Sequence, residues 1–129
     1  MIYVDTSVAL AHLLAEDRRP PASFWAETLV SSRMLEYEIW TRLHARDLAV
    51  SHASGADEVI GRIALLELAP PVLARALDAF PVAVRTLDAL HLSSLEFLRG
   101  RGLDVELASY DRRMVSSAQS LGIPVRDLT

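Results

Sequence analysis

The sequence MIYVDTSVALAHLLAED, residues 1–17, joins an expected strand directly to an expected helix. Residues 1–5 form a short apolar run with β-branched side chains, which is typical of a buried strand. Residues 6–17 follow without a turn, and Thr6 or Ser7 at their start predicts a helix with a side-chain N-cap. A buried strand that leads straight into a helix indicates the opening unit of an α/β fold.

Short apolar segments and helical segments alternate along the rest of the chain as well. Further strands are predicted at residues 28–32, 64–68, 105–109 and 123–128. Further helices are predicted at residues 34–48, 54–63, 70–80, 85–100 and 110–122, with one more that begins at Pro20 or Pro21. This alternation predicts an α/β sandwich around a mainly parallel sheet. The Gly and Pro breaks between the segments read as loops, so we expect one domain over residues 1–129.

The composition is that of an ordinary globular protein. The chain has 129 residues, of which 51% are hydrophobic and 23% are charged. It has no cysteine, which excludes disulfides and thiolate metal sites. No apolar run has membrane-spanning length and no basic signal-peptide segment opens the chain, so a cytoplasmic location is expected. The net charge of −4 argues against a broad nucleic-acid surface but leaves room for a local basic rim, and all 13 basic residues are arginine.

Four carboxylates fall where an α/β sheet binds its ligands. Asp5 closes the first expected strand, and Asp111 follows the expected strand at 105–109. In open parallel sheets, ligands bind outside the carboxyl ends of the strands. Asp88 lies in the first turn of its helix, and Glu38 borders the apolar stripe of another helix.

Four carboxylates at one edge of a sheet would repel one another strongly unless something compensated their charge. A divalent cation is the natural compensation, and hard oxygen ligands select Mg²⁺ or Mn²⁺. Such a site could orient water on a phosphodiester and stabilise the charge that develops there.

Each acid also has a simpler structural interpretation. Asp88 can complement the dipole of its own helix, with Thr86 as the N-cap. Glu38 can be solvated at the edge of its helix, and Asp111 can cap the helix that follows it. For Asp5, at the end of a buried strand, an N-cap role is open but explains the residue less well.

The stretch RTLDALHLSSL, residues 85–95, poses this alternative most clearly. We expect its four leucines at positions 87, 90, 92 and 95 to lie in the core, with Asp88 placed among them. A buried carboxylate is unfavourable unless a cation, a helix N-terminus or water compensates it.

Five short motifs, taken in order, resemble the PIN-domain family and, within it, the VapC-type ribonuclease toxins of toxin–antitoxin systems. They are VDTS at 4–7, SRMLEYEIWTRL at 32–43, LDALHLS at 87–93, SYDRRM at 109–114 and GIPV at 122–125. Two departures from the family pattern are mild: Ser109 replaces the commoner Thr, and Ser93 replaces the commoner Ala. Neither departure removes an acid.

This resemblance implies a three-layer α/β/α sandwich with a central, mainly parallel sheet of about five strands. It also implies endoribonuclease activity that depends on Mg²⁺, or on Mn²⁺ as a substitute, and cleaves RNA with metal-activated water. A VapB-like antitoxin and a homodimer are the partners that it implies.

The same resemblance makes Asp5, Glu38, Asp88 and Asp111 the metal-binding and catalytic acids. Ser7 and Ser109 become supporting groups of the site. Glu36 stands two residues before Glu38 and is the alternative at that position, although the spacing from Ser32 favours Glu38.

Several other polar residues have weaker interpretations. Arg112 and Arg113 directly follow Asp111 and are candidates for RNA phosphate contacts, since arginine suits phosphate oxygens. Arg85, Arg42 and Arg46 are further candidates for the same rim. We expect His91 to be a packed core histidine rather than a general base. Six other acids read as ordinary solvated charges, namely Glu16, Asp17, Asp57, Glu58, Asp104 and Glu106.

Other functional classes fit the residues less well. Phosphoacceptor receivers and aspartate-nucleophile phosphatases depend on a lysine in the site, and this chain has no lysine. A PIN-like module that binds RNA or protein without cleavage is the main alternative. The presence of all four acids argues against it, because degenerate members usually lose some of them.

Overall fold

Four short parallel strands form the centre of the protein, as a computed structural model describes it for residues 1–129. The strands are β1 (Ile2–Val4), β2 (Leu29–Ser32), β3 (Ala64–Leu66) and β4 (Glu106–Ala108). The helices are α1 (Thr6–Leu13), α2 (Met34–Ala45), α3 (Ala53–Gly61), α4 (Pro70–Leu77), α5 (Thr86–Gly100), α6 (Arg112–Ser120) and the short 3₁₀ helix η1 (Ala22–Ala26). None of the helices has both the length and the apolar character needed to span a bilayer.

The sheet has the strand order β3-β2-β1-β4, and every neighbouring pair is parallel. The connections from β1 lead outward through β2 to β3, whereas β4 is added on the other side of β1. The order of the strands therefore reverses between β1 and β4. A crevice opens at such a reversal, outside the carboxyl ends of the strands.

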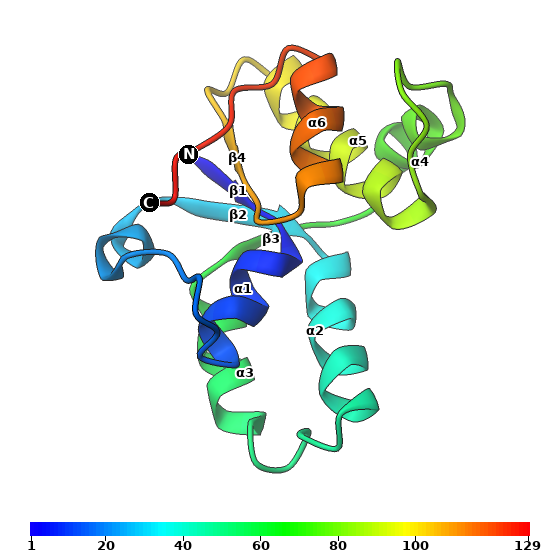
Figure 1. Cartoon of the computed structure of the whole chain (residues 1–129). Coiled ribbons are helices and arrows are strands. Elements are labelled where there is room, and N and C mark those ends of the chain that lie inside the picture. Colours follow the sequence, from blue (N-terminus) through cyan, green and yellow to red (C-terminus); the bar gives the residue numbers. More distant parts are fainter.

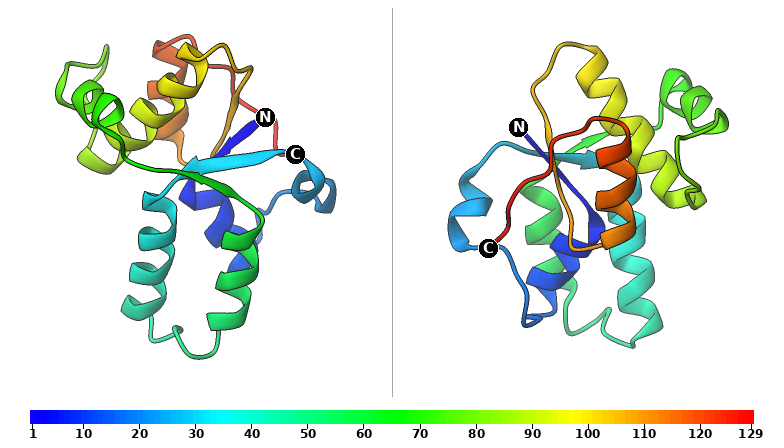
Figure 2. Two further views of the ribbon diagram at one scale, coloured as in Figure 1. Left: turned by 180° about the vertical axis from the view of Figure 1, so that it is seen from behind. Right: turned by 45° about the horizontal axis from the view of Figure 1, so that its top comes forward.

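The helices cover both faces of the sheet, as the sequence predicts. Figure 1 shows α1, α2 and α3 on one side, and α4, α5 and α6 on the other. Figure 2 shows the same three layers from behind and from above. Each face has its own apolar core, one of 14 buried residues beneath α1, α2 and α3, and one of 10 beneath α5 and α6. The predicted α/β/α sandwich is confirmed.

The fifth strand predicted at 123–128 is wrong. This segment runs beside β4 but forms only one isolated bridge, between Leu107 and Val125. The N–H of Leu107 donates to the carbonyl of Pro124 at 2.8 Å, and the N–H of Arg126 donates to the carbonyl of Leu107 at 2.7 Å. Pro124 has no N–H with which to extend the ladder, so the pairing stops there.

The predicted helix caps are only partly right. Asp111 caps α6 with its side chain, but the first residues of α1, α3 and α5 have no side-chain cap. Thr6 and Thr86 lie inside their helices, and Asp5 and Arg85 hold the N-cap positions. The helix expected after the double proline is the 3₁₀ turn η1, with Pro21 as its N-cap.

The leucines of α5 do not all lie in the core. Leu92 and Leu95 are buried at 1% exposure each, and Leu90 is half-buried. Leu87 is 42% exposed, so the prediction that it belongs to the core is wrong. Leu87 occupies the first turn of α5, which projects beyond the edge of the sheet.

Leu92→Ala is expected to lower the free energy of unfolding by about 2–5 kcal/mol, because it leaves a cavity against the sheet. Leu87→Ala on the same helix should change it by about 0.5 kcal/mol or less, since that side chain is largely in water. Urea denaturation of the two variants measures both values. Equal losses in the two variants would contradict this description of α5.

Candidate active site

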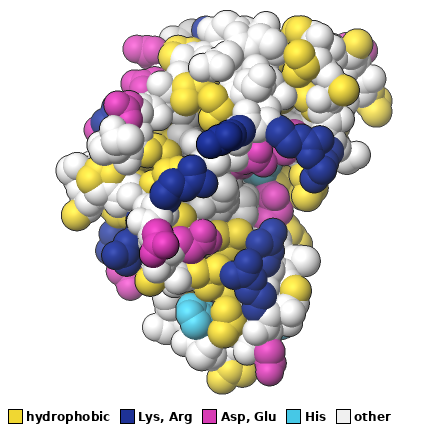
Figure 3. Space-filling view, viewed as in Figure 1, with side chains coloured by type: hydrophobic (Ala, Val, Ile, Leu, Met, Phe, Trp, Pro, Cys, Tyr) yellow, Lys and Arg dark blue, Asp and Glu magenta, His cyan; other side chains and the backbone are white.

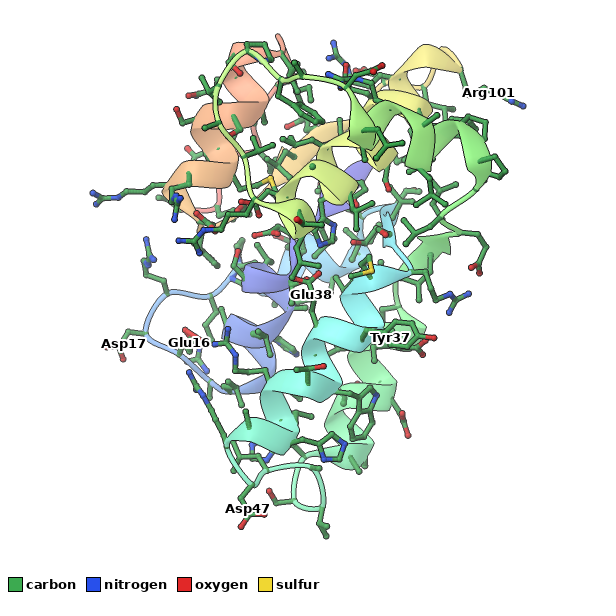
Figure 4. The ribbon with its side chains drawn as sticks, turned by 90° about the vertical axis from the view of Figure 1, so that its right-hand side faces the viewer. Glu16, Asp17, Tyr37, Glu38, Asp47 and Arg101 are labelled. Carbon is green, nitrogen blue, oxygen red and sulfur yellow. The ribbon has the colours of Figure 1, made fainter.

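An open cavity of about 900 Å³ lies at the reversal in strand order, and all four predicted acids line it. Asp5 follows β1, Glu38 comes from α2, Asp88 from the first turn of α5, and Asp111 immediately precedes α6. Figure 4 looks toward this edge of the sheet, with Glu38 near the middle, between the two helical layers. Its neighbour Tyr37 points to the outside of α2. The fold thus brings together residues that are as many as 106 positions apart, from Asp5 to Asp111.

Backbone pairing fixes the position of Asp5. Val4 pairs with Ala108, and the N–H of Asp5 donates to the carbonyl of Ala108 at 2.9 Å. The ends of β1 and β4 are therefore held side by side, and the residues that follow each strand enter the same cavity.

Two serines hold one oxygen of the Asp5 carboxylate. The hydroxyls of Ser7 and Ser109 donate to Oδ2 of Asp5 at 2.6 and 2.8 Å. These hydroxyls in turn accept the backbone N–H groups of Tyr110 and Asp111, each at 3.0 Å. Oδ1 of Asp5 has no hydrogen bond within the protein. The predicted supporting serines thus contact the predicted acid, and they orient it with one oxygen unpaired.

Glu38 also has two donors to one of its carboxylate oxygens, whereas Glu36 lies outside the cavity. Oε1 of Glu38 accepts the Thr6 hydroxyl at 2.9 Å and lies 2.5 Å from Nε2 of His91. Oε2 has no hydrogen bond within the protein. Glu36 instead pairs with Arg33 at 3.4 Å and does not line the cavity. Of the two glutamates, Glu38 is the one that faces the other acids.

His91 is the main polar contact that the sequence interpretation missed. Its side chain is buried, as expected of a core histidine, but both ring nitrogens have partners. Nδ1 lies 2.8 Å from the hydroxyl of Tyr3, and Nε2 contacts Glu38. Burial by itself lowers the pKa of His91, but the hydrogen bond to Glu38 and the nearby carboxylates outweigh it and raise that pKa. The spacing of three residues from Asp88, on one face of α5, was the available signal.

Asp111 caps its helix and also lies at the cavity. Its Oδ1 accepts the backbone N–H groups of Arg113 and Met114 at 2.9 and 3.3 Å, which caps α6. Its Oδ2 has no hydrogen bond within the protein, and the residue also lines the cavity. The capping interpretation and the site interpretation are therefore compatible for this residue.

Asp88 is the acid with the least support from protein donors, because neither of its oxygens has a hydrogen bond. Partial burial raises its pKa, and the negative charges of Asp111 and Asp5 raise it further. The ionised form of Asp88 is thus unfavourable in the folded protein, because the side chain is partly buried and lies near other carboxylates.

The four acids share a cavity but are not drawn together around one point. The protein contains no group of three or more His, Asp or Glu side chains already arranged to hold a metal ion. Mutual repulsion favours this separation when nothing offsets the charges. Each acid nevertheless keeps at least one carboxylate oxygen unpaired, and carboxylate oxygens are the ligands that Mg²⁺ and Mn²⁺ prefer.

Arginines also lie near the acids, and one of those that line the cavity, Arg42, was among the candidates from the sequence. Arg18 and Arg42 line the cavity, whereas Arg112 and Arg113 are exposed at the start of α6 outside its lining. The guanidinium of Arg18 lies over the ring of Tyr110, 5.1 Å from its centre. Figure 3 shows arginines on several sides of the acidic side chains near the middle of this face.

Glu16 and Asp17 belong to the wall of the same cavity, so their interpretation as ordinary solvated charges is incomplete. Figure 4 shows both on the loop that follows α1. Their side chains are exposed and have no ion-pair partner. They form an outer acidic edge, next to Arg18.

The comparison with known families agrees with this geometry. The sequence profile of the PIN domain family matches residues 2–118. The chain belongs to the PIN-domain family. Ribonuclease VapC46 of Mycobacterium tuberculosis is 30% identical over 128 residues, which cover 96% of this chain and 95% of the relative. Ribonuclease VapC47 of the same species is 27% identical over 129 residues, covering 95% and 93%. This PIN domain is therefore similar, over nearly its whole length, to proteins named as VapC ribonucleases.

Asp88→Asn is expected to stabilise the metal-free protein at neutral pH. Because the folded state raises the pKa of Asp88, the protein loses stability as the pH rises through that raised pKa. The amide removes this loss, so the variant should unfold about 1–4 °C above the wild type at pH 7. The advantage should vanish below about pH 4, where the carboxyl is protonated in both states. Calorimetry with a chelator present measures both differences.

Asp57→Asn is the matched control, because Asp57 is exposed on α3 and has no ion-pair partner. It should leave the unfolding temperature unchanged at both pH values. An Asp88→Asn variant that unfolds at a lower temperature than the wild type at pH 7 would instead support a purely helix-stabilising role for Asp88.

Proposed function

We propose that this PIN domain, over residues 1–129, is a divalent-metal-dependent endoribonuclease and the toxin of a VapBC-type toxin–antitoxin pair that acts in the cytoplasm. The observation that carries the proposal is that Asp5, Glu38, Asp88 and Asp111 line one cavity, each with an unpaired carboxylate oxygen. The full-length similarity to proteins named as VapC ribonucleases supports the reaction class.

The residues of the cavity fit a Mg²⁺ or Mn²⁺ ion. The unpaired oxygens of the four acids are hard ligands. Partial burial and then the charges of Asp111 and Asp5 raise the pKa of Asp88, and a cation would offset both effects. Asp5 and Asp88 are the proposed direct ligands, and Glu38 and Asp111 complete the site. When bound, a divalent cation would offset charge on the scissile phosphate and promote the loss of a proton from water.

The remaining polar groups have separate tasks in this mechanism. Ser7 and Ser109 keep Asp5 in one orientation, and Thr6 does the same for Glu38. Arg18 and Arg42 line the cavity and would bind phosphates of RNA, with Arg112 and Arg113 as further candidates beside it, because guanidinium groups suit phosphate oxygens. Such contacts hold the backbone in line for attack without reading its base sequence.

In an inactive toxin of this kind, the acidic cavity has to be covered by a partner. We propose a VapB-like antitoxin whose basic side chains would satisfy these carboxylates, and a homodimer as the active form. An antitoxin that occupies the cavity would compete with both RNA and metal for the same groups.

Purified wild-type protein is expected to cut total cellular RNA into discrete fragments with Mg²⁺ or Mn²⁺, and to stop when a chelator is added. Asp5→Asn, Glu38→Gln, Asp88→Asn and Asp111→Asn should each lower the cleavage rate by on the order of 100-fold or more while the protein remains folded. Gel analysis of the fragments and circular dichroism of each variant measure the two properties. Asp57→Asn should cleave like the wild type.

Fragments that persist in the Asp88→Asn variant would place the activity elsewhere. A folded wild-type protein that binds RNA equally well with and without metal, and does not cut it, would support a non-catalytic PIN-like binding module instead.

Expression of the wild-type chain alone in a bacterial host is expected to arrest growth, because an uncovered site degrades essential RNA. Asp88→Asn should permit normal growth at the same protein level, since it keeps the fold but weakens the site. Growth curves together with immunoblots check this result. Equal arrest by both chains would contradict the assignment of toxicity to the acidic cavity.

A further inference from the structure

The acid on α2 is connected to the opposite layer of the protein by one buried chain of hydrogen bonds. The Tyr3 hydroxyl, on β1, contacts Nδ1 of His91 at 2.8 Å, and Nε2 of His91, on α5, contacts Glu38 at 2.5 Å. Tyr3 is fully buried and His91 is 1% exposed. The chain of contacts therefore runs from α2 in one layer to α5 in the other, and it ends on β1 in the sheet.

The chemistry of Glu38 fixes the direction of its hydrogen bond to His91. A glutamate carboxylate only accepts, so the Nε2–H of His91 is the donor to Glu38. The Tyr3 hydroxyl can donate to a neutral Nδ1 or accept from a protonated one, so it pairs with Nδ1 in either state of the ring. The ring planes of Tyr3 and His91 meet at 83°, with their centres 5.8 Å apart, so the imidazole is held by packing as well as by hydrogen bonds.

Both donors to Glu38 bind the same oxygen. Thr6 and His91 each contact Oε1, which leaves Oε2 without a hydrogen bond in a side chain that lines the cavity. A glutamate has several rotatable bonds, and on a helix at the edge of an open cavity it would otherwise sample many orientations. Thr6 is a neighbour of Asp5 on the same layer, whereas His91 is the only donor to Glu38 from the opposite layer.

We propose that His91, anchored by Tyr3, is a positioning residue that fixes the Glu38 carboxylate for the divalent cation of the site. This inference rests on the proposed function and assigns to the LDALHLS motif a task beyond supplying Asp88. His91 does not contact RNA or metal in this arrangement, because it is buried behind Glu38. Hydrogen-bonded partners of metal-ligating carboxylates change metal affinity or activity by about 10- to 100-fold when they are removed.

Two substitutions of similar size separate this role from simple packing. The amide of His91→Gln reaches about as far as Nε2 and can still donate to Glu38, whereas the amide of His91→Asn reaches only the position of Nδ1. His91→Asn should weaken Mn²⁺ binding by about 10- to 100-fold in isothermal titration calorimetry. His91→Gln should retain an affinity within a few-fold of the wild type, although both variants lose the buried ring and should unfold at lower temperatures.

Tyr3→Phe is a milder substitution than His91→Asn in the same chain of hydrogen bonds, because it removes only the hydroxyl and keeps the buried ring. It should lower Mn²⁺ affinity in the same direction as His91→Asn but by less, in a protein that remains folded. His44→Asn is the matched control, since His44 is exposed on α2 and makes no hydrogen bond to an acid of the site. It should leave Mn²⁺ affinity unchanged.

Equal Mn²⁺ affinities in His91→Gln, His91→Asn and Tyr3→Phe, whether all at the wild-type value or all lowered alike, would overturn the positioning role. If the wild type cleaves RNA, Asp88→Asn does not, and His91→Asn binds Mn²⁺ like the wild type, this inference alone fails. If the wild-type protein neither binds Mn²⁺ nor cleaves RNA, the proposed function fails, and the inference fails with it.

Discussion

The parallel pairing of β1 with β4 is the constraint on which the rest of the site depends. It aligns Val4 with Ala108, so that the two strands end at the same level and Asp5 and Ser109 follow side by side. Because β4 joins the sheet on the opposite side of β1 from β2, helices from both layers begin around this point. α1, α2 and α5 therefore each contribute a polar side chain to one cavity, and the loop before α6 contributes Asp111.

In three of the four acids, the two carboxylate oxygens have different surroundings. In Asp5, Glu38 and Asp111, one oxygen accepts two protein donors and the other accepts none. The donors are serine and threonine hydroxyls, an imidazole and the N–H groups of a helix end. They orient the acids and partly offset their charge without neutralising it. Asp88 has no such donor to offset the burial and the neighbouring charges of Asp111 and Asp5, all of which raise its pKa.

The sequence predicted the layers and the acids well because their signals are local. A buried strand with an Asp at its end can be recognised from five residues, and the order of the elements then implies a shared edge. The predictions that failed depend on contacts between residues that are far apart in the sequence. Thr6 and Ser7 are good N-cap residues, but their hydroxyls bind Glu38 and Asp5 instead. The loop with Glu16 and Asp17 enters the cavity wall through packing that no local pattern shows.

The hydrogen-bond partners of His91 could not be predicted for the same reason. Its burial was expected from the family resemblance, yet its two partners lie 88 and 53 residues away in the chain. The absence of the fifth strand has a local cause instead, since Pro124 lacks the N–H that would extend the pairing on its side of the single bridge. Overall architecture thus followed from periodicity, whereas the hydrogen-bond partners of the site required the fold itself.

In the proposed function, the four separated acids form one cation site at the carboxyl edge of the sheet. The most direct test is to add substoichiometric Mn²⁺ to the isotopically labelled protein and to record which NMR signals broaden. We expect the broadening to be centred on Asp5, Glu38, Asp88 and Asp111, and to be weaker in Asp88→Asn. Broadening centred on Glu16 and Asp17, or spread evenly over the acidic surface, would contradict it.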